Sequence, residues 1–429
     1  MNNFKELQEK MGHNYTFDCV QCGYCLPACP TYETMGKETH SPRGRINLVK
    51  MAAEGKISLD AIREPIDKCL GCRACQTVCP TSVEYGKILE GAKEVLADHQ
   101  SLSFPKKRAK DFIFKDLFPQ RSRMNSFGNL MWVYQASGMQ KLVRSLHVTK
   151  LAPLHLGEFE AIMPKVVSPN ERKKRESVAK AEGKTRKTVA FFTGCIMDTV
   201  FYQTNQNSIK LLKKAGADVF IPNEQTCCGA LHAHAGDMAD AKELAKKNIE
   251  VFEKEGIDYV VNNAGGCGAM LKEYDHLFEG DPEWHERAKR FSERSKDISQ
   301  ILSELDALIF TKEINEVVTY QPSCHLTNVQ KVENEPLDLL KSIPGITYRE
   351  MQDHNRCCGS AGIYNIVNYE DSMQILDSKM EKFKPTKAST IVTSNPGCLL
   401  QMQMGIKREN IEHQVRAIHL LDFLAEAID

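Results

Sequence analysis

Residues 19–30 read CVQCGYCLPACP, and residues 69–80 repeat the arrangement as CLGCRACQTVCP. In each stretch two residues separate the first three cysteines, and a fourth cysteine follows after three more residues and precedes a proline. Three thiolates at this spacing can hold three irons of a cubane, while the fourth cysteine points to a second cluster. Zinc sites close with four ligands from paired CxxC units and do not need this three-plus-one run. The two stretches therefore predict two [4Fe–4S] clusters.

The predicted ligand sets cross between the two stretches. One set is Cys19, Cys22, Cys25 and Cys79, and the other is Cys69, Cys72, Cys75 and Cys29. Between the stretches, Arg43 and Arg45 could bring positive charge near a cluster, which would raise its potential by stabilising the reduced form. Ordinary surface charge is the alternative for both arginines.

The other eight of the 16 cysteines form an internal repeat. Each half contains a lone cysteine, a Cys-Cys-Gly triplet and a second lone cysteine, and the three landmarks are shifted by 129, 130 and 131 residues. Such a near-constant shift indicates a duplicated unit. The repeats contain Cys195, Cys227, Cys228 and Cys267, and then Cys324, Cys357, Cys358 and Cys398.

Each Cys-Cys-Gly triplet could present two thiolates to one metal centre, because adjacent cysteines form poor disulfides. The following Gly229 or Gly359 would relieve backbone strain. Structural buried cysteines are the alternative. Four histidines lie near these cysteines, and an imidazole can replace a thiolate on iron or serve only in hydrogen bonding and packing. They are His232, His234, His325 and His354, of which His325 beside Cys324 is the best candidate ligand.

Apolar, β-branched runs precede the cysteines of both repeats, and helical patterns follow them. The runs are residues 188–193, 259–262, 317–320 and 390–393. This order predicts α/β units with mainly parallel sheets, whose cysteines lie in loops at the carboxyl ends of the strands. The expected fold is a multidomain α+β protein, in which a helical two-cluster ferredoxin domain precedes two pseudo-symmetric α/β cysteine-rich domains.

With 429 residues, the chain is expected to form two or three domains. Residues 101–150 carry ten lysines and arginines against Asp111 and Asp116, with aromatic residues interleaved. This stretch is interpreted as the solvated face of helices packed on the ferredoxin domain, with docking to an acidic partner or to anionic lipid as alternatives. The expected divisions are 1–100 for the ferredoxin domain, 101–169 for a basic helical connector, 170–187 for a charged, solvated linker, and 188–310 and 311–429 for the cysteine-rich domains.

Composition excludes some classes of function. Basic and acidic residues balance at 56 each, so charge gives no reason to expect nucleic-acid binding. The polar N-terminus lacks the apolar segment of a signal peptide, which predicts a cytosolic chain with reduced thiols. No apolar run is long enough to span a membrane, which leaves peripheral contact with the cytoplasmic face of the plasma membrane as an alternative. No GxGxxG follows a predicted strand, so flavin or nicotinamide is expected on another subunit.

The whole chain resembles the glycolate oxidase iron–sulfur subunit family. The resemblance rests on the double ferredoxin pattern, on both Cys-Cys-Gly domains and on the local sequences at residues 19–25, 42–45, 227–232 and 357–362. It implies an electron-transfer subunit of a flavin-dependent 2-hydroxy-acid dehydrogenase complex, in which partner subunits with FAD oxidise glycolate to glyoxylate. This chain would then pass the electrons to a quinone or another carrier and would hold no catalytic residue of its own.

Two related families leave alternatives open. The layout is also similar to the small subunit of anaerobic glycerol-3-phosphate dehydrogenase, so a glycerol-3-phosphate or lactate dehydrogenase complex is an alternative. The later repeats are similar to a heterodisulfide reductase subunit with noncubane clusters, which would reduce a disulfide. In that family each repeat ends in CxxC, whereas here the ends read CGAM at 267–270 and CLLQ at 398–401. The repeats are therefore expected to hold at least one further iron–sulfur cluster, with four thiolates or with a histidine ligand.

Overall fold

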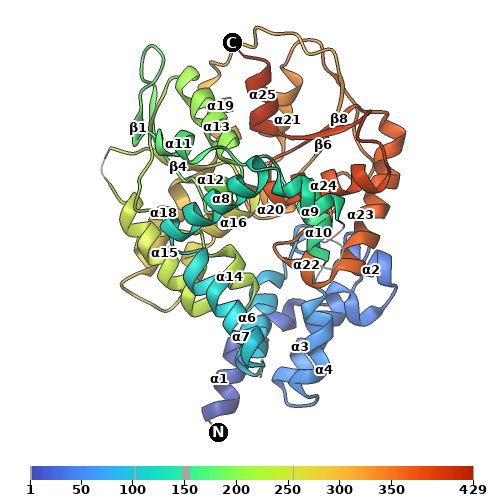
Figure 1. The fold of residues 1–429 in the computed structure, drawn as a ribbon. Coiled ribbons are helices and arrows are strands. Elements are labelled where there is room, and N and C mark those ends of the chain that lie inside the picture. Colours follow the sequence, from blue (N-terminus) through green and yellow to red (C-terminus); the bar gives the residue numbers. More distant parts are fainter. Residues whose placement is uncertain (1, 101–102, 147–154, 255, 429) are drawn as a thin grey trace.

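The computed structural model describes residues 2–100, 103–146, 155–254 and 256–428. Figure 1 shows the helical N-terminal part, in blue, below two sheet-containing halves coloured green to yellow and orange to red. This arrangement confirms the predicted fold class. Both ends of the stretch 101–150, namely 101–102 and 147–150, lie outside the described residues.

The N-terminal domain consists of short helices around an apolar core that includes Val49, Ile62 and Ile88. The start of α3 is well defined, because Pro42 occupies its first turn and the hydroxyl of Ser41 accepts a hydrogen bond from the Gly44 amide. The cysteine loops lie between these helices. The elements are α1 (Asn2–Lys10), η1 (His13–Asp18), α2 (Pro30–Met35), η2 (Glu38–His40), α3 (Pro42–Ala53), α4 (Leu59–Asp67), α5 (Ala74–Thr77) and α6 (Tyr85–Asp98).

The described helices between residues 104 and 162 pack on the cysteine-rich repeats and not mainly on the N-terminal domain. The hydroxyl of Thr226 donates to the Pro119 carbonyl at 2.7 Å, and α10 contacts the last long helix of the second repeat. The elements are α7 (Phe104–Asp111), η3 (Phe112–Leu117), α8 (Arg121–Ala136), α9 (Met139–Ser145) and α10 (Leu156–Ile162).

The first cysteine-rich repeat has a five-stranded sheet in the order β1-β3-β2-β4-β5, parallel except for the β1–β3 pair. Its strands are β1 (Val178–Ala179), β2 (Lys187–Phe191), β3 (Ala217–Phe220), β4 (Tyr259–Asn262) and β5 (Ser295–Asp297). Its helices are α11 (Pro169–Lys173), α12 (Ile196–Thr199), α13 (Tyr202–Lys214), α14 (Ala230–His234), α15 (Met238–Phe252), α16 (Gly265–Lys272), α17 (Tyr274–Leu277), α18 (His285–Arg294) and α19 (Ile298–Leu305).

The second repeat has a fully parallel four-stranded sheet in the order β7-β6-β8-β9. Its strands are β6 (Val317–Gln321), β7 (Thr347–Tyr348), β8 (Thr390–Thr393) and β9 (Arg416–His419). Its helices are α20 (Cys324–Asn328), α21 (Asn334–Lys341), α22 (Tyr364–Val367), α23 (Tyr369–Phe383), η6 (Lys384–Thr386), α24 (Pro396–Arg408) and α25 (Leu420–Glu426).

All four strands expected from the β-branched runs are present, as β2, β4, β6 and β8. The two sheets share one apolar core, in which Val189 and Val261 of the first repeat belong to the same cluster as Val318 and Val392 of the second. Helix α13 packs on α25 at this interface, where the Thr204 hydroxyl donates to the Asp422 carboxylate at 2.7 Å. The repeats are therefore joined by apolar burial as well as by polar contacts.

The charged segment 170–187 is built into the first repeat. Its start lies in α11, where the Arg172 side chain is buried, and β1 extends the sheet beside β3. The segment therefore contributes structure to the domain in addition to the exposed charges expected from its sequence. Among the described helices, none combines the length and the apolar character needed to cross a membrane.

Candidate iron–sulfur sites

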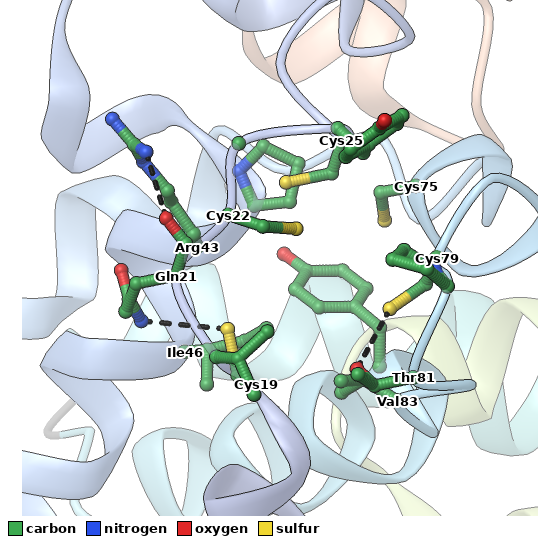
Figure 2. Close-up of a pocket in the computed structure, with 16 residues that line it drawn as sticks. Cys19, Gln21, Cys22, Cys25, Arg43, Ile46, Cys75, Cys79, Thr81 and Val83 are labelled. Carbon is green, nitrogen blue, oxygen red and sulfur yellow. Dashed lines mark hydrogen bonds between the residues drawn. The ribbon is translucent and has the colours of Figure 1, made fainter.

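The first predicted ligand set forms one pocket, here called the outer ferredoxin site. It is lined by Cys19, Cys22, Cys25 and Cys79. Figure 2 shows these thiols around a common space, with Arg43 and Thr81 at its margin. The Gln21 amide donates to the Cys19 sulfur at 3.4 Å, and Cys22 is exposed to solvent. A cluster held here would therefore lie near the protein surface.

The second predicted set lines a separate pocket, the inner ferredoxin site. It contains Cys29, Cys69, Cys72 and Cys75. The Gly71 amide donates to the Cys69 sulfur at 3.4 Å, and the Tyr85 hydroxyl lies 3.3 Å from the same sulfur. Cys29 thus lies with the second stretch and Cys79 with the first, which is the crossed arrangement expected from the spacing. Cys75 lines both pockets, so the two sites are adjacent.

Two arginines near these pockets have different environments. Arg45 is buried beside the inner site, where its Nε donates to the Pro65 carbonyl at 2.7 Å and its Nη1 lies 4.0 Å from the Cys29 sulfur. Arg43 lines the outer site, donates to the Gln21 carbonyl at 3.0 Å and pairs with Glu38 at 2.7 Å. A buried guanidinium near cysteine thiolates stabilises their negative charge, so Arg45 is more than ordinary surface charge.

The first cysteine-rich site assembles at the carboxyl ends of β2, β3 and β4. Cys195 precedes α12, the pair Cys227–Cys228 follows β3, and Cys267 lies in the first turn of α16. The sulfurs of Cys195 and Cys227 are 3.6 Å apart, and the Cys228 thiol contacts both Cys227 and Cys267. Parallel strands present their following loops at one sheet edge, which explains how distant cysteines meet.

The second cysteine-rich site repeats this construction. Its members are Cys324, Cys357, Cys358 and Cys398, and their thiols form the same chain of contacts from Cys324 through the pair to Cys398. Gly359 follows the pair with φ of +94°, in the left-handed region that favours glycine. A Cβ on Gly359 would lie 2.8 Å from the Ser372 carbonyl oxygen, so both conformation and space require glycine at this position.

The donor sets fit polynuclear clusters. In the described parts of the chain, no three His, Cys, Asp or Glu side chains are grouped so that they could hold a single metal ion. The thiols are nevertheless gathered in sets of four. Burial raises the pKa of Cys72 and Cys75 well above the usual thiol value. Such thiols would give up their protons when a metal centre supplies positive charge.

The sites lie in a continuous series. Cys72 of the inner ferredoxin site and Cys324 of the second cysteine-rich site are close enough to interact electrostatically, and the Asn328 amide donates to the Cys72 carbonyl at 2.8 Å. The Asn395 side chain then joins the two repeats. Its oxygen accepts from the Gly266 amide at 3.1 Å, and its nitrogen lies 3.6 Å from the Cys398 sulfur. The order is therefore outer ferredoxin site, inner ferredoxin site, second repeat and first repeat.

The four candidate histidines occupy positions around the sites. His325 Nε2 lies 3.0 Å from the Gly71 carbonyl oxygen, and its ring is 5.3 Å from that of His234. Buried His232 is bonded through Nε2 to the Phe114 carbonyl at 2.7 Å, and His354 lies 3.7 Å from Glu350. These contacts suit hydrogen-bonding and packing roles, and a ligand role for His325 stays a prediction.

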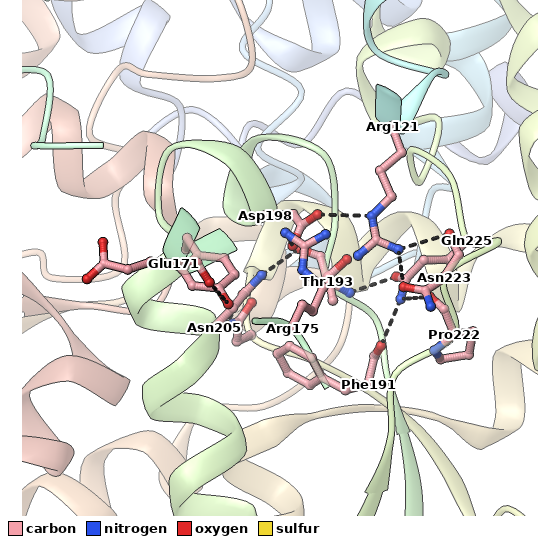
Figure 3. A network of polar contacts seen from close by, with 12 residues as sticks. Arg121, Glu171, Arg175, Phe191, Thr193, Asp198, Asn205, Pro222, Asn223 and Gln225 are labelled. Atoms are coloured by element: carbon pink, nitrogen blue, oxygen red, sulfur yellow. Dashed lines mark hydrogen bonds and ion pairs between the residues drawn. The ribbon is translucent and has the colours of Figure 1, made fainter. Parts of the chain in front are cut away.

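An ion-pair network around the buried Asp198, beside the first cysteine-rich site, was not found from the sequence. Figure 3 shows Arg121 and Arg175 converging on Asp198, with ion-pair distances of 3.3 and 2.8 Å. Burial raises the pKa of the Asp198 carboxyl, although both arginines oppose this shift. Arg121, Asp198, Cys195 and Cys227 line the same small pocket. Because Arg175 comes from the segment expected to be a linker, no local pattern could have indicated the pairing.

Comparisons with known proteins agree with this organisation. Residues 16–83 match the 4Fe-4S dicluster domain, residues 189–272 and 318–403 match the cysteine-rich domain, and residues 105–163 match the linker region of the glycolate oxidase iron-sulfur subunit.

The chain is 49% identical over 426 residues to the probable glycolate oxidase iron-sulfur subunit of Bacillus subtilis, covering 98% of this chain and 96% of the relative. It is 27% identical to the glycolate oxidase iron-sulfur subunit of Escherichia coli, over 93% of this chain and 92% of that protein. Lactate utilization protein A of Oceanobacillus iheyensis is 34% identical, over 55% of this chain and 96% of that protein.

A solved structure supports the fold alone. The crystal structure of a hypothetical protein from Helicobacter pylori aligns with a TM-score of 0.53 at 9% identity, covering 90% of this chain and 68% of that one.

Proposed function

Because this chain belongs to the glycolate oxidase iron–sulfur subunit family, we propose that it is the electron-transfer subunit of a complex that oxidises glycolate to glyoxylate. The observation that carries this proposal is the continuous series of four cysteine sets, from an exposed site to buried ones. Contiguous one-electron sites suit a protein that moves electrons between a partner and a carrier. Iron–sulfur clusters bound here would accept and release electrons singly, with potentials tuned by charge, burial and hydrogen bonds to sulfur.

Hydride abstraction belongs to partner subunits in this proposal. A flavin takes two electrons at once and can pass them on singly, so an FAD-binding subunit is the expected donor and a quinone or another carrier the acceptor. The exposed side chains of Val20 and Tyr24 line the outer ferredoxin site and offer an apolar contact for a redox partner. The proposed cluster ligands are the 16 cysteines of the four sites.

Iron and acid-labile sulfide, measured on anaerobically purified protein, test the cluster assignment. Twelve or more irons per chain, roughly the content of three cubanes, would support at least one cluster in the repeats. Cys227→Ser and Cys357→Ser variants would then assign it by the electron paramagnetic resonance signal that each removes. An iron content of about eight would restrict clusters to the ferredoxin domain and contradict this part of the proposal.

Purification of the complex tests the substrate. The complex should contain FAD on a second polypeptide, and glycolate should bleach both the flavin and the iron–sulfur absorbance. Lactate and glycerol 3-phosphate are the matched comparison substrates, because the chain is also similar to lactate utilization protein A. Faster reduction by either of them would assign the complex to that substrate instead of glycolate.

Membrane contact is proposed for the surface formed by α8 and α9, here called the connector face. Helix α8 exposes Phe127, Leu130 and Val133 at successive turns, and α9 exposes Met139 and Leu142 in the same way. These two helices follow each other in the chain and contact each other. The same helices carry three cations, of which Arg123 pairs with Asp116 and Arg144 with Glu160, and the third is Lys141. Exposed apolar side chains edged by cations suit an interface with anionic lipid headgroups on the cytoplasmic face.

Liposome flotation of the intact complex tests this contact. Binding is expected to vesicles that contain anionic lipid at low salt, and Leu130→Ser with Leu142→Ser should abolish it. Ile309→Ser, an exposed apolar residue in the second half of the chain, is the matched control. Equal flotation of both variants, or none by the unchanged complex, would contradict the proposal.

A further inference from the structure

Equivalent helices of the two repeats carry different residues beside their cysteine pairs. Helices α15 and α23 both contain 15 residues and begin 131 positions apart, which is the shift of the neighbouring cysteine landmarks. Asn248 of α15 therefore corresponds to Lys379 of α23. The duplicated fold gives the two residues the same place, while their charges differ.

Asn248 supports the first Cys-Cys pair through neutral hydrogen bonds. Its side-chain oxygen accepts from the Thr226 amide at 3.0 Å, and its nitrogen donates to the Cys227 carbonyl at 3.0 Å and the Tyr274 hydroxyl at 3.1 Å. The side chain is fully buried. Its role in the first repeat is therefore to hold the loop that presents the cysteine pair.

Lys379 supports the corresponding loop of the second repeat with a charge. Its Nζ donates to the carbonyls of Asp353, His354 and Arg356 at 3.0, 2.8 and 3.3 Å. The side chain is 2% exposed, and its charge interacts with Cys357 and Cys358. A buried ammonium is costly unless carbonyls or negative charge compensate it.

The charged groups around this loop do not neutralise Lys379. Lys382 and Arg356 both pair with Glu33 and with Asp353. Within the described residues, no carboxylate oxygen lies within ion-pair distance of Lys379 Nζ, whose hydrogen-bond partners are the three carbonyl oxygens. Lys379 and Cys357 line the same small pocket. Apart from the Asp353 carboxylate, which is already paired with Lys382 and Arg356, the negative charge that acts on Lys379 is that of Cys357 and Cys358 when their thiols are ionised.

We propose that Lys379 stabilises the reduced form of the cluster held by the second cysteine-rich site, and so makes this site a better electron acceptor for the adjoining inner ferredoxin site. This inference rests on the proposed function, because it requires a cluster at Cys324, Cys357, Cys358 and Cys398. Each electron adds one negative charge, and a nearby buried cation lowers the energy of the reduced state more than that of the oxidised state. Asn248 supports its loop without a charge, so the two repeats differ in how strongly they would stabilise a reduced cluster.

Redox titration of the full-length protein, followed by electron paramagnetic resonance, tests the inference. The signal removed by Cys357→Ser identifies the second cysteine-rich site. Lys379→Gln should shift the midpoint of this signal downward by at least tenfold in the reduction equilibrium, which is about 59 mV for one electron. Lys379→Arg keeps the charge and should keep the midpoint. Lys384→Gln, an exposed lysine just after the same helix, is the matched control and should change nothing.

The possible outcomes distinguish an electrostatic role of Lys379 from a purely structural one. An unchanged midpoint in Lys379→Gln with full iron content would overturn the inference. Loss of this cluster in Lys379→Gln but not in Lys379→Arg would support it, since the charge would then be needed to hold the cluster. Loss in both variants would overturn it, because only the geometry of lysine would matter. An iron content of about eight in the unchanged protein would instead contradict the cluster assignment on which the inference depends.

Discussion

His325 places its Nε2 3.0 Å from the backbone oxygen of Gly71. The residue after the first cysteine of the second cysteine-rich site therefore bonds to the loop of the inner ferredoxin site. Because a carbonyl oxygen can only accept, His325 Nε2 carries the proton in this contact. The bond joins residues 254 positions apart and fixes one cysteine loop against another.

Replacing His325 by Phe should loosen this junction without removing iron. The Gly71 oxygen would lose a buried partner, which costs about 1–3 kcal/mol, so the unfolding temperature should fall. His354→Phe is the control, because His354 lies half-buried beside Glu350. Differential scanning calorimetry and iron analysis measure both effects. Loss of about four irons in His325→Phe alone would instead identify His325 as a cluster ligand.

Asp198 should be one of the most sensitive acidic residues in the chain. Asp198→Ala leaves the half-buried Arg121 and Arg175 without their shared counter-charge. Because the carboxylate is buried but the arginines are only half-buried, the cost should lie between the value for an exposed pair, about 0–1 kcal/mol, and that for a fully buried pair, about 3–5 kcal/mol. Asp116→Ala removes the exposed partner of Arg123 and should cost only about 0–1 kcal/mol. Similar unfolding temperatures for the two variants would contradict the structural importance of the network.

Gly359→Ala should disturb the second cysteine-rich site. An L-residue at φ of +94° is strained, and its Cβ would meet the Ser372 carbonyl at 2.8 Å, so the backbone must move. Gly36→Ala is a matched control, because Gly36 also has a positive φ, of +65°, but no atom within 4 Å of the added Cβ. Thermal unfolding and iron content should both fall further in Gly359→Ala. Equal losses would show that backbone conformation alone, without the contact, sets the cost.

Asp297 should make stability depend on pH. This buried carboxyl caps α19 and accepts from the Ser299 amide at 2.9 Å. Burial raises the pKa of Asp297 to about 6, from 3.8. The folded state therefore binds its proton more tightly than the unfolded state, and stability is lost as pH rises from about 4 to 6. Above that range the penalty is complete and amounts to at most about 3 kcal/mol.

Asp297→Asn keeps a side-chain oxygen that can cap the helix but removes the charge. The variant should therefore gain stability relative to the unchanged protein between pH 5 and pH 7. Unfolding temperatures measured at both pH values test this expectation. If the variant and the unchanged protein differ in unfolding temperature by the same amount at pH 5 and pH 7, Asp297 does not titrate in this range.

Spacing within the sequence determined the two ferredoxin cysteine sets, because three predicted ligands of each set lie on one short loop and need no distant element to bring them together. It also determined the duplication, the four principal strands and the membership of both Cys-Cys-Gly sets, because parallel strands place their following loops at one edge. The packing of the connector on the repeats was not predicted, because apolar residues of α8 occur at both buried and exposed positions. Met124 is buried, whereas Leu130 is exposed.

Tertiary structure alone decided which sites adjoin and which charges surround them. The contacts of His325 with Gly71, of Asn395 with Gly266, and of Arg121 with Asp198 join residues separated by between 77 and 254 positions. Lys379 is an ordinary lysine in an amphipathic helical pattern until the fold buries it beside the second Cys-Cys pair. Electrostatic and hydrogen-bonding effects depend on distance in space and on burial, and a local sequence pattern specifies neither across such separations.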